Sequence, residues 1–335
     1  MNKIYNYILC FLCGILFYYI VNSIDKLELG GDVVDPIIGG WCMCANNFPL
    51  WDSTKTNTLI AGGFNQDGSI GPFEKFGISI SNNLSLNDKC FDSSFLNNYD
   101  HKWLSVGGEW VGCKSASSSC PEKYLDCLNQ ENIIRLIKKY NFNGIAFDME
   151  GCLHLDSKSI TVFEAIEKLI YNIKIIYPDF VFVYVGGNYL PYYNEYLKSS
   201  GTDKLFTYIA PMLYWGDTTY QMSYNTTNID NTLRSWTDNG WLKKQIILTF
   251  QTISAAGGCD HHPKENCNPT LAYNYRNNNN NNITKGKKIL DHLIEKYNGD
   301  GYIGFLGWPP VYENNIDGKD DSDYCIDYIK SNINK

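Results

Sequence analysis

Two carboxylates lie two residues apart in the segment Asn143–Glu150, whose sequence is NGIAFDME. In a β-strand, residues i and i+2 point to the same face, so we expect Asp148 and Glu150 to share one face with Ala146. When two like charges are buried together, one of the two groups tends to keep a proton near neutral pH. Such a pair suits a general acid supported by a second carboxylate. The alternative is an ordinary strand end that carries two solvated acids.

Aromatic residues make up 15% of the chain, with 25 Tyr and 8 Trp, and they either fill a large core or line a surface that binds rings. Indole rings offer flat apolar platforms for the CH groups of a sugar, and the indole N–H can meet a hydroxyl. One Trp at a strand end is usually a core residue, whereas several around one rim indicate a ring-binding cleft. Four tryptophans stand at or just past the ends of expected strands: Trp41, Trp110, Trp215 and Trp308.

Short apolar runs alternate with polar loops and helical stretches along the chain, and several runs are almost continuously apolar, as expected for strands covered on both faces. Strands are predicted over Ile37–Met43, Leu59–Phe64, Trp103–Val106, Gly144–Met149, Phe180–Val185, Thr207–Tyr214, Ile246–Thr252 and Tyr302–Leu306. Apolar residues at helical spacing predict helices over Asn132–Tyr140, Ile160–Ile176, Asn228–Trp236, Lys287–Tyr297 and Tyr324–Ile333.

This alternation predicts a single-domain α/β fold, the (β/α)8 or TIM barrel, and a doubly wound open sheet is the structural alternative. In such a barrel, chemistry takes place at the C-terminal ends of the strands. Besides the two carboxylates and the four tryptophans, the residues expected there are Gly107, Gly108, Glu109, Gly186, Asn188, Tyr214, Asp217 and Gln251.

The N-terminus predicts an export signal. A basic start precedes the apolar run Ile8–Val21, whose fourteen residues span roughly 21 Å as a helix, short of the ~30 Å hydrocarbon core. We therefore expect residues 1–23 to be a signal peptide and residues 24–335 to be the barrel domain. The alternative is an uncleaved anchor that would hold the protein at a membrane. The protein is accordingly expected to be secreted or to reside in the lumen of the secretory pathway.

The charge bears on possible partners, and the cysteine content bears on export. The net charge of -8 argues against a nucleic-acid partner. Of the 12 Cys, ten lie beyond the leader, and an even number suggests disulfides whose pairing the sequence does not assign. Cys259 and Cys267 bracket a short loop and form the easiest local pair to propose, and the spacing of the nearby His261 and His262 fits no common zinc site. Candidate glycosylation sites are Asn83, Asn225 and Asn282.

The carboxylate segment resembles the signature of glycoside hydrolase family 18, the chitinases and related endo-N-acetylglucosaminidases. That signature reads Asp-Gly-x-Asp-x-Asp-x-Glu, and its terminal Glu is the catalytic acid. Here Glu150 matches that Glu, Asp148 matches the preceding acid and Gly144 matches the glycine. Asn143 and Ala146 replace the first and second Asp of the signature.

Three further segments agree with the family in order and position. Ser105–Gly108 resembles the Ser-x-Gly-Gly motif of the third strand. Met212–Tyr214 resembles the Met-x-Tyr motif of the sixth strand, although Trp215 stands where an Asp often follows. Trp308 resembles the Trp at the end of the eighth strand that floors the sugar site. The resemblance covers most of the chain, from about Ile37 to Trp308.

The resemblance implies an O-glycosyl hydrolase of N-acetylglucosamine-containing oligo- or polysaccharides that needs no metal or organic cofactor. Glu150 would protonate the glycosidic oxygen, while the substrate's own 2-acetamido carbonyl attacks the anomeric carbon. Asp148 would orient the acetamido N–H, Tyr214 would bind its oxygen, and Trp308 would lie beneath the sugar. The other residues expected to bind substrate are Trp41, Trp110, Trp215, Met212, Gly107, Gly108 and Gln251.

The departures from the signature leave two main hypotheses. Asn143 begins its strand, where we expect a structural role. Ala146 removes a buried acid that would otherwise share a proton with Asp148, so the charge of Asp148 should differ from the family norm. The first hypothesis is a secreted glycosidase for chitin or related glycans. The alternative is a catalytically weak or inactive chitinase-like lectin, motivated by Ala146 and Trp215, and an unrelated barrel with accidental motif matches is a third reading.

Overall fold

The computed structural model describes residues 35–43, 51–62, 93–107, 124–125, 127–149, 157–186, 205–213, 226–251, 290–308 and 321–333. The chain divides into two compact units, Met1–Pro36 and Ile37–Lys335, and the strands and helices described below belong to the second. Within the described ranges, no helix is both long enough and apolar enough to cross a lipid bilayer.

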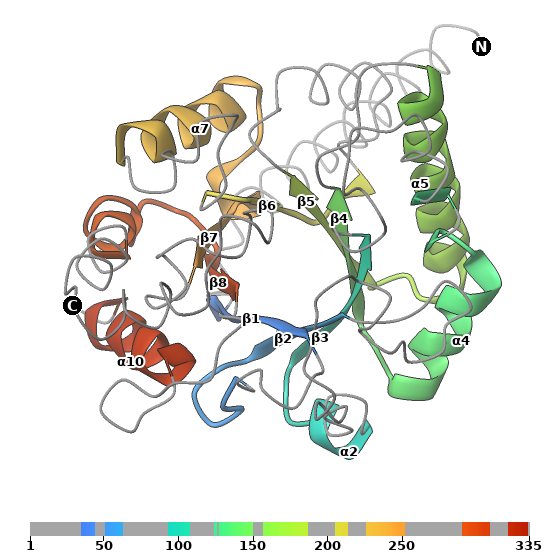
Figure 1. The fold of residues 1–335 in the computed structure, drawn as a ribbon, viewed down its shortest axis with the longest axis horizontal. Helices are drawn as coiled ribbons and strands as arrows, with labels where there is room; N and C mark the ends of the chain where they lie inside the picture. The colour runs from blue at the N-terminus through green and yellow to red at the C-terminus, as the bar shows by residue number, and fades with distance from the viewer. Residues whose placement is uncertain are drawn as a thin grey trace, which may run out of the picture. The chain divides into compact units, whose positions relative to one another are not determined.

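The described part of the second unit contains eight parallel strands in the order β6-β5-β4-β3-β2-β1-β8-β7 (Figure 1). The sheet closes where its two ends meet: Ile209 on β6 forms a parallel bridge with Ile246, the residue directly before β7. The predicted (β/α)8 barrel is therefore confirmed, and β1 and β4 have the predicted bounds. The strands are β1 Ile37–Met43, β2 Thr58–Gly62, β3 His101–Gly107, β4 Gly144–Met149, β5 Val181–Gly186, β6 Tyr208–Pro211, β7 Ile247–Gln251 and β8 Gly304–Trp308.

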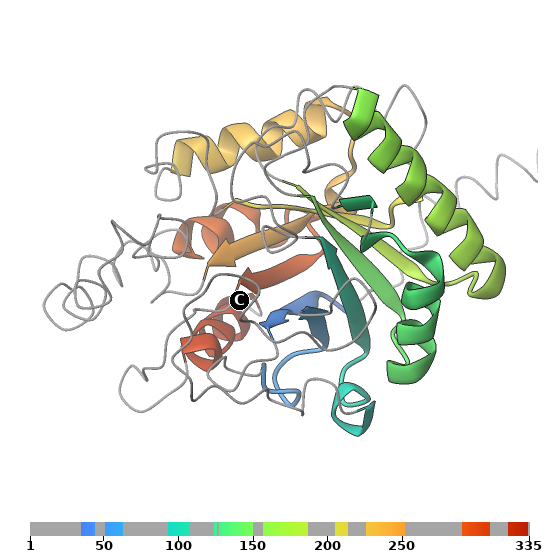
Figure 2. The same ribbon diagram turned by 45° about the vertical axis from the view of Figure 1, so that its right-hand side comes forward.

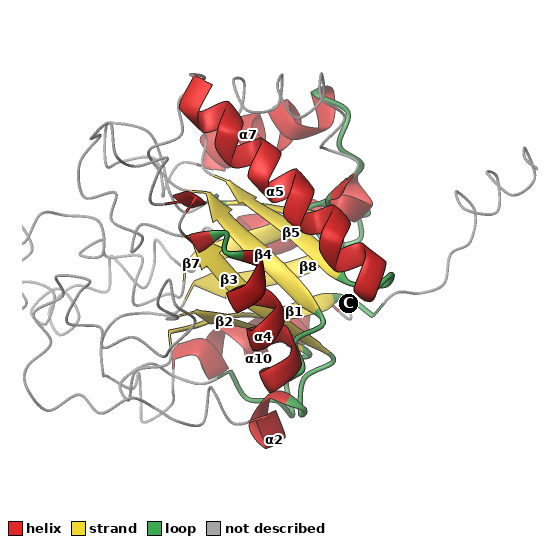
Figure 3. Ribbon diagram, turned by 90° about the vertical axis from the view of Figure 1, so that its right-hand side faces the viewer, coloured by secondary structure: helices red, strands yellow, loops and turns green. Residues whose placement is uncertain are grey.

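Helices surround the strands on the outside of the barrel (Figures 1 and 2). They are α2 Ser93–Leu96, α4 Gln130–Tyr140, α5 Ser157–Ile176, α7 Thr226–Asp238 and α10 Asp321–Ile333, with a further helix over 290–297 and the short 3-10 helix η6 Lys243–Gln245. Figure 3 shows the same arrangement from the side, with α4 and α5 lying along the outer face of the sheet near β4.

Helix α4 illustrates how local sequence sets these elements. The Asn129 side chain accepts a hydrogen bond from the N–H of Asn132 and so caps the first turn. The helix ends at Tyr140, and the next residue, Asn141, has the left-handed φ of 55° that asparagine tolerates. The residues it buries, at helical spacing, are Ile133, Leu136, Ile137 and Tyr140. One apolar stripe thus faces the sheet while the lysines face solvent.

Alternate residues of each strand enter two separate apolar clusters. On β4, Ile145 and Phe147 pack in the outer cluster with the helices, whereas Ala146 faces the barrel interior. This two-residue alternation is the one that the sequence predicts. The interior cluster consists of Ile37, Trp41, Ile60, Trp103, Ala146, Val183, Val185, Ala210, Met212, Ile247 and Leu306.

Polar residues join the N-terminal ends of three strands, β2, β4 and β6, to their neighbours. A residue directly before β2, β4 and β6 accepts a hydrogen bond through its side chain from the N–H of a residue on the preceding strand. Its own N–H donates back to the C=O of that same residue. Each such pair, which we call a strand clamp, supplies two hydrogen bonds where the ladder begins. The three clamps are Asn57 with Ile38, Asn143 with Lys102, and Thr207 with Phe182.

Candidate active site

All eight strands run parallel, so their C-terminal ends meet at the same end of the barrel. This end receives Gly107 from β3, Asp148 from β4, Met212 just after β6, and the last residue of β8, Trp308. Strand β8 lies four strands away from β4 around the barrel, and therefore across the interior from it. Residues that are far apart in the sequence are thus brought to one mouth.

Asp148 is an ionisable residue buried at this mouth. Its side chain is only 3% exposed, and it is the one acid among the buried polar residues of the described ranges, the others being Thr56, Thr58 and Thr249. In the sheet it lies opposite Gly107 on β3 and Val185 on β5. Burying a carboxylate costs several kcal/mol in general, so a carboxylate kept in this position points to a function rather than to stability.

Glycine is required beside Asp148. Gly107 has a φ of +102°, which side chains rarely adopt, and a Cβ there would lie 2.4 Å from the backbone oxygen of Asp148. The end of β3 can therefore approach the end of β4 only where position 107 has no side chain. This contact gives a physical reason for a glycine at this position of the Ser-x-Gly-Gly segment.

The layer of side chains next to Asp148 on the same face of β4 is apolar. Ala146 is fully buried, and it pairs in register with Ser105 on β3 and Val183 on β5. Its neighbours in the interior cluster are hydrocarbon and aromatic side chains. Within the described ranges, Asp148 therefore has no second carboxylate buried beside it, in contrast to the signature with an acid at position 146.

The end of β6 is held from both sides. The N–H of Met212 donates to the C=O of Gly186 on β5 at 2.9 Å. The N–H of Leu213 donates to the hydroxyl of Thr249 on β7, also at 2.9 Å. Sequence reasoning missed Thr249, although one signal was present: it is a polar residue at an inward-facing position of an apolar strand. These bonds fix the backbone immediately before Tyr214.

Strand β6 is shorter than predicted, covering Tyr208–Pro211 rather than residues 207–214. At its start, Thr207 uses its side chain as well as its backbone to bond to Phe182. At its end, Pro211 has no N–H, so it cannot donate to a ladder. The N–H of Met212 still donates to Gly186 on β5, so the donor missing at Pro211 is one on the side that faces β7.

All five tryptophans with a described side chain lie in the core, including Trp241 at 4% exposure. Trp41, Trp51, Trp103 and Trp236 are all less than 2% exposed. Trp41, which we predicted to bind a sugar, packs among the interior residues, and Met212 does the same at 1% exposure. The high aromatic content therefore serves the core at these positions, and a role in substrate binding for Trp41 and Met212 stays a prediction.

The remaining predicted site residues lie outside the part of the chain that the structure describes, or have only their backbone described. Glu150 directly follows the last residue of β4, and Tyr214 directly follows Leu213, but both lie outside the described residues, as do Gly108, Trp110 and Trp215. Only the backbone is described for Gln251 and Trp308. Their convergence on Asp148 stays a prediction. Among the described residues, no group of three or more His, Cys, Asp and Glu side chains is placed to hold a metal ion.

Comparison with known proteins finds a likeness of structure. No protein-family model matches the sequence, and no curated protein sequence matches it. The barrel instead has the fold of chitinases, including members of glycoside hydrolase family 18.

Three solved structures illustrate the likeness. A class V chitinase from Nicotiana tobaccum is 14% identical, with a TM-score of 0.54 over 88% of this chain and 99% of that chain. The catalytic domain of a family GH18 chitinase from the fern Peteris ryukyuensis is 10% identical, with a TM-score of 0.54 over 87% and 98%. Chitinase ChiA74 from Bacillus thuringiensis is 12% identical, with a TM-score of 0.52 over 89% and 70%. At these identities the likeness is one of fold.

Proposed function

We propose that this chain is a glycosidase that hydrolyses β-1,4-linked N-acetylglucosamine in chitin or related glycans. The observation that carries the proposal is Asp148, a carboxylate buried at the C-terminal mouth of a barrel with a chitinase fold. Glu150 stands two residues further along the same segment, at the spacing that puts both acids on one face of an extended chain.

In the proposed mechanism the substrate supplies its own nucleophile. Glu150 gives its proton to the glycosidic oxygen as the carbonyl oxygen of the 2-acetamido group attacks the anomeric carbon, and the bond to the leaving sugar breaks. Asp148 orients the acetamido N–H and stabilises its growing positive charge. Tyr214 hydrogen-bonds the acetamido oxygen and holds it in line. Glu150, now a carboxylate, takes a proton from water, whose oxygen opens the cyclic intermediate.

The neighbouring structures support the substrate class. A variant of the Nicotiana tobaccum chitinase with Glu replaced by Gln was solved in complex with NAG4. By analogy, we propose that Trp308 forms the floor beneath one sugar ring of a similar oligosaccharide. A direct assay on each polymer would show whether the protein cleaves chitin or the N-acetylglucosamine core of a glycan.

The second candidate function is that of a chitinase-like lectin. Ala146 favours it, because the buried acid that the family signature has at this position is replaced by a methyl group in an apolar layer. A lectin would keep the barrel and the sugar-binding mouth but would turn over no substrate. The two functions share a fold, so only an assay for hydrolysis distinguishes them.

The deciding experiment compares wild type with Glu150→Gln on a fluorogenic tri-N-acetylchitosaccharide. The proposal expects turnover by wild type and a loss of about 1,000-fold in Glu150→Gln, since general acid catalysis contributes on the order of 10² to 10⁴. Glu131→Gln, at an exposed position in the first turn of α4, is the matched control and should keep full activity. If calorimetry shows that wild type binds the oligosaccharide but the assay shows no turnover, the lectin function is supported and the glycosidase function is rejected.

We also propose that the protein enters the secretory pathway through its apolar leader. N-terminal sequencing of protein recovered from culture medium should begin after Ser23. A chain that stays membrane-bound and begins at its original N-terminus would show that the leader is an anchor instead.

A further inference from the structure

Thr249 lies on β7, at the closing edge of the barrel, and its side chain is fully buried. Its neighbours along the strand, Leu248 and Phe250, pack in the outer cluster, so Thr249 takes the inward-facing register of Ile247. A polar side chain at zero exposure needs hydrogen bonds to compensate for lost water. Both functions of its hydroxyl are used.

The Thr249 hydroxyl bridges the backbone on either side of Met212. Its oxygen accepts a hydrogen bond from the N–H of Leu213 at 2.9 Å, and its proton is donated to the C=O of Pro211. From the opposite side, the C=O of Gly186 accepts the N–H of Met212 at 2.9 Å. Pro211 at the end of β6 and the two residues that follow it are therefore held by both neighbouring strands.

The Thr249 hydroxyl replaces backbone hydrogen bonds that β6 and β7 do not form with each other. In the described ranges, the one bridge between these two edges joins Ile209 on β6 to Ile246, which directly precedes β7. Toward the C-terminal end, Pro211 has no N–H to offer, and the side chain of Thr249 supplies both a donor and an acceptor. A valine of the same shape would supply neither.

We propose that Thr249 is a positioning residue for the reaction. By fixing Pro211 and Leu213, it sets the direction in which the chain enters Tyr214, the residue proposed to hold the acetamido oxygen. The inference rests on the proposed function, because the catalytic value of this direction depends on Tyr214 binding the substrate. Thr249 itself touches backbone, and its effect on the chemistry passes through Tyr214.

The test uses Thr249→Val in the full-length protein, with kcat and KM measured on a fluorogenic tri-N-acetylchitosaccharide. We expect kcat to fall about 10- to 100-fold with a smaller rise in KM, since a small misplacement of a reacting group has effects of this order and Tyr214 is proposed to contact the bound substrate. Thr249→Ser keeps the hydroxyl and should restore most of the rate. If Thr249→Val does not fold, Thr249→Cys, whose thiol is a weak donor, takes its place.

Thr58→Val is the matched control. Thr58 is also a fully buried threonine on a strand, and its hydroxyl donates to Asn57 at the other end of the barrel. We expect it to lower stability as Thr249→Val does while kcat is unchanged. A double variant, Thr249→Val with Tyr214→Phe, should be no slower than Tyr214→Phe alone, because both changes act through one contact.

Equal kcat in Thr249→Val and wild type, or fully multiplicative losses in the double variant, would overturn the inference. If the wild-type protein turns over no substrate, the proposed function fails, and the inference is judged on calorimetric affinity for tri-N-acetylchitotriose. A weaker affinity in Thr249→Val than in Thr58→Val would support it. Equal affinities in these two variants would refute it.

Discussion

The two ends of strand β4 perform different tasks. At the N-terminal end, Asn143 joins β4 to β3: its side chain accepts from the N–H of Lys102 at 2.9 Å and donates to the C=O of Asp100. At the C-terminal end, Asp148 is a carboxylate buried beside a glycine at a strand end. The first arrangement pairs polar groups of the backbone, whereas the second keeps an acid where its burial is costly.

The same contrast extends around the barrel. The interior near the N-terminal end holds rings without charge: the ring of Trp103 lies 5.7 Å from that of His101 and 6.3 Å from that of Tyr208. Burial lowers the pKa of His101, against a smaller opposing effect of Asp100, and burial raises the pKa of Tyr208. Both side chains are therefore held in their neutral forms, so this end contributes packing and strand registration.

The comparison explains why the two departures from the family signature matter unequally. An amide at position 143 can accept the same backbone hydrogen bond as a carboxylate, so the strand clamp survives the replacement of Asp by Asn. At position 146, a methyl group replaces an acid in the interior, which changes the surroundings of Asp148. Under the proposed function, the second departure is the one that bears on chemistry.

Among the tests that compare the two ends of β4, the largest effect is expected from Asp148→Asn. We predict that kcat on the fluorogenic tri-N-acetylchitosaccharide falls by about 100-fold or more, because a neutral amide cannot stabilise the positive charge that develops on the acetamido group. Asp179→Asn, at an exposed turn before β5, should leave kcat unchanged. Full activity in folded Asp148→Asn would contradict the proposal that the C-terminal end of β4 is catalytic and the N-terminal end structural.

At the other end, Asn143→Ala should lower stability and not chemistry. Losing both side-chain hydrogen bonds, and leaving the Lys102 N–H without its acceptor, should cost about 2 kcal/mol of unfolding free energy. Asn143→Asp keeps the acceptor and should cost less. Urea unfolding gives the stabilities, and kcat per folded molecule should equal that of wild type. A loss of kcat without a loss of stability would place catalytic chemistry at the N-terminal end.

A cluster on the outer wall belongs to neither end and should affect stability alone. Asp230 on α7 accepts hydrogen bonds from His292, at 2.7 Å, and from Lys296 and Tyr297 on the helix over 290–297. Partial burial raises the pKa of Asp230, but the hydrogen bonds from Lys296, Tyr297 and His292 outweigh burial and lower it from 3.8 to about 2.

Because the pKa of Asp230 is lowered on folding, its contribution to stability is present above pH 4 and fades as the pH falls toward about 2. Asp230→Asn should therefore be about 1 kcal/mol less stable than wild type at pH 6, a value kept small by solvent screening. The two unfolding curves should converge as the pH approaches 2. A constant difference between pH 6 and pH 2 would show that the charge of Asp230 contributes nothing.

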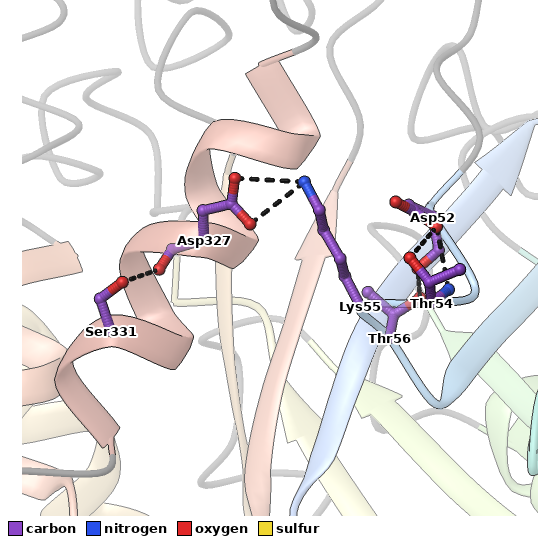
Figure 4. Close-up of polar contacts among 6 residues, drawn as sticks. All are labelled: Asp52, Thr54, Lys55, Thr56, Asp327 and Ser331. Atoms are coloured by element: carbon purple, nitrogen blue, oxygen red, sulfur yellow. Dashed lines mark hydrogen bonds and ion pairs between the residues drawn. The ribbon is translucent and has the colours of Figure 1, made fainter.

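The smallest expected effect concerns an exposed ion pair near the start of β2 (Figure 4). Lys55 lies 3.1 Å from each carboxylate oxygen of Asp327 on α10, while the neighbouring Asp52 accepts two hydrogen bonds from Thr54. Both partners of the ion pair are partly exposed, so Lys55→Met should change the unfolding free energy by less than about 1 kcal/mol. A loss as large as that of Asn143→Ala would mean that exposed charges hold this end as firmly as the strand clamps do.

Local pattern was sufficient to predict the barrel. The apolar runs marked all eight strands, and alternation along β4 separated Ile145 and Phe147 from Ala146 and Asp148. Local pattern was not sufficient to predict the strand clamps or the hydrogen bonds of Thr249. Their hydrogen bonds depend on which residue of a neighbouring strand lies opposite, and this register is set by packing across the whole barrel.

Trp41 shows another limit of sequence reasoning. A tryptophan near a strand end predicts either a sugar platform or a core residue, and the spacing is the same for both. In the structure its side chain is 1% exposed and lies in the interior cluster. Burial depends on how closely the opposing strands approach, which no local pattern contains.

The stereochemistry of the first product tests the proposed chemistry at the C-terminal mouth most directly. Proton NMR during digestion of tri-N-acetylchitotriose shows which anomer of the released reducing sugar forms before mutarotation. We predict that the β-anomer forms first, because attack by the acetamido group and then by water inverts the anomeric carbon twice. Early appearance of the α-anomer, or no released sugar from folded protein, would contradict the account.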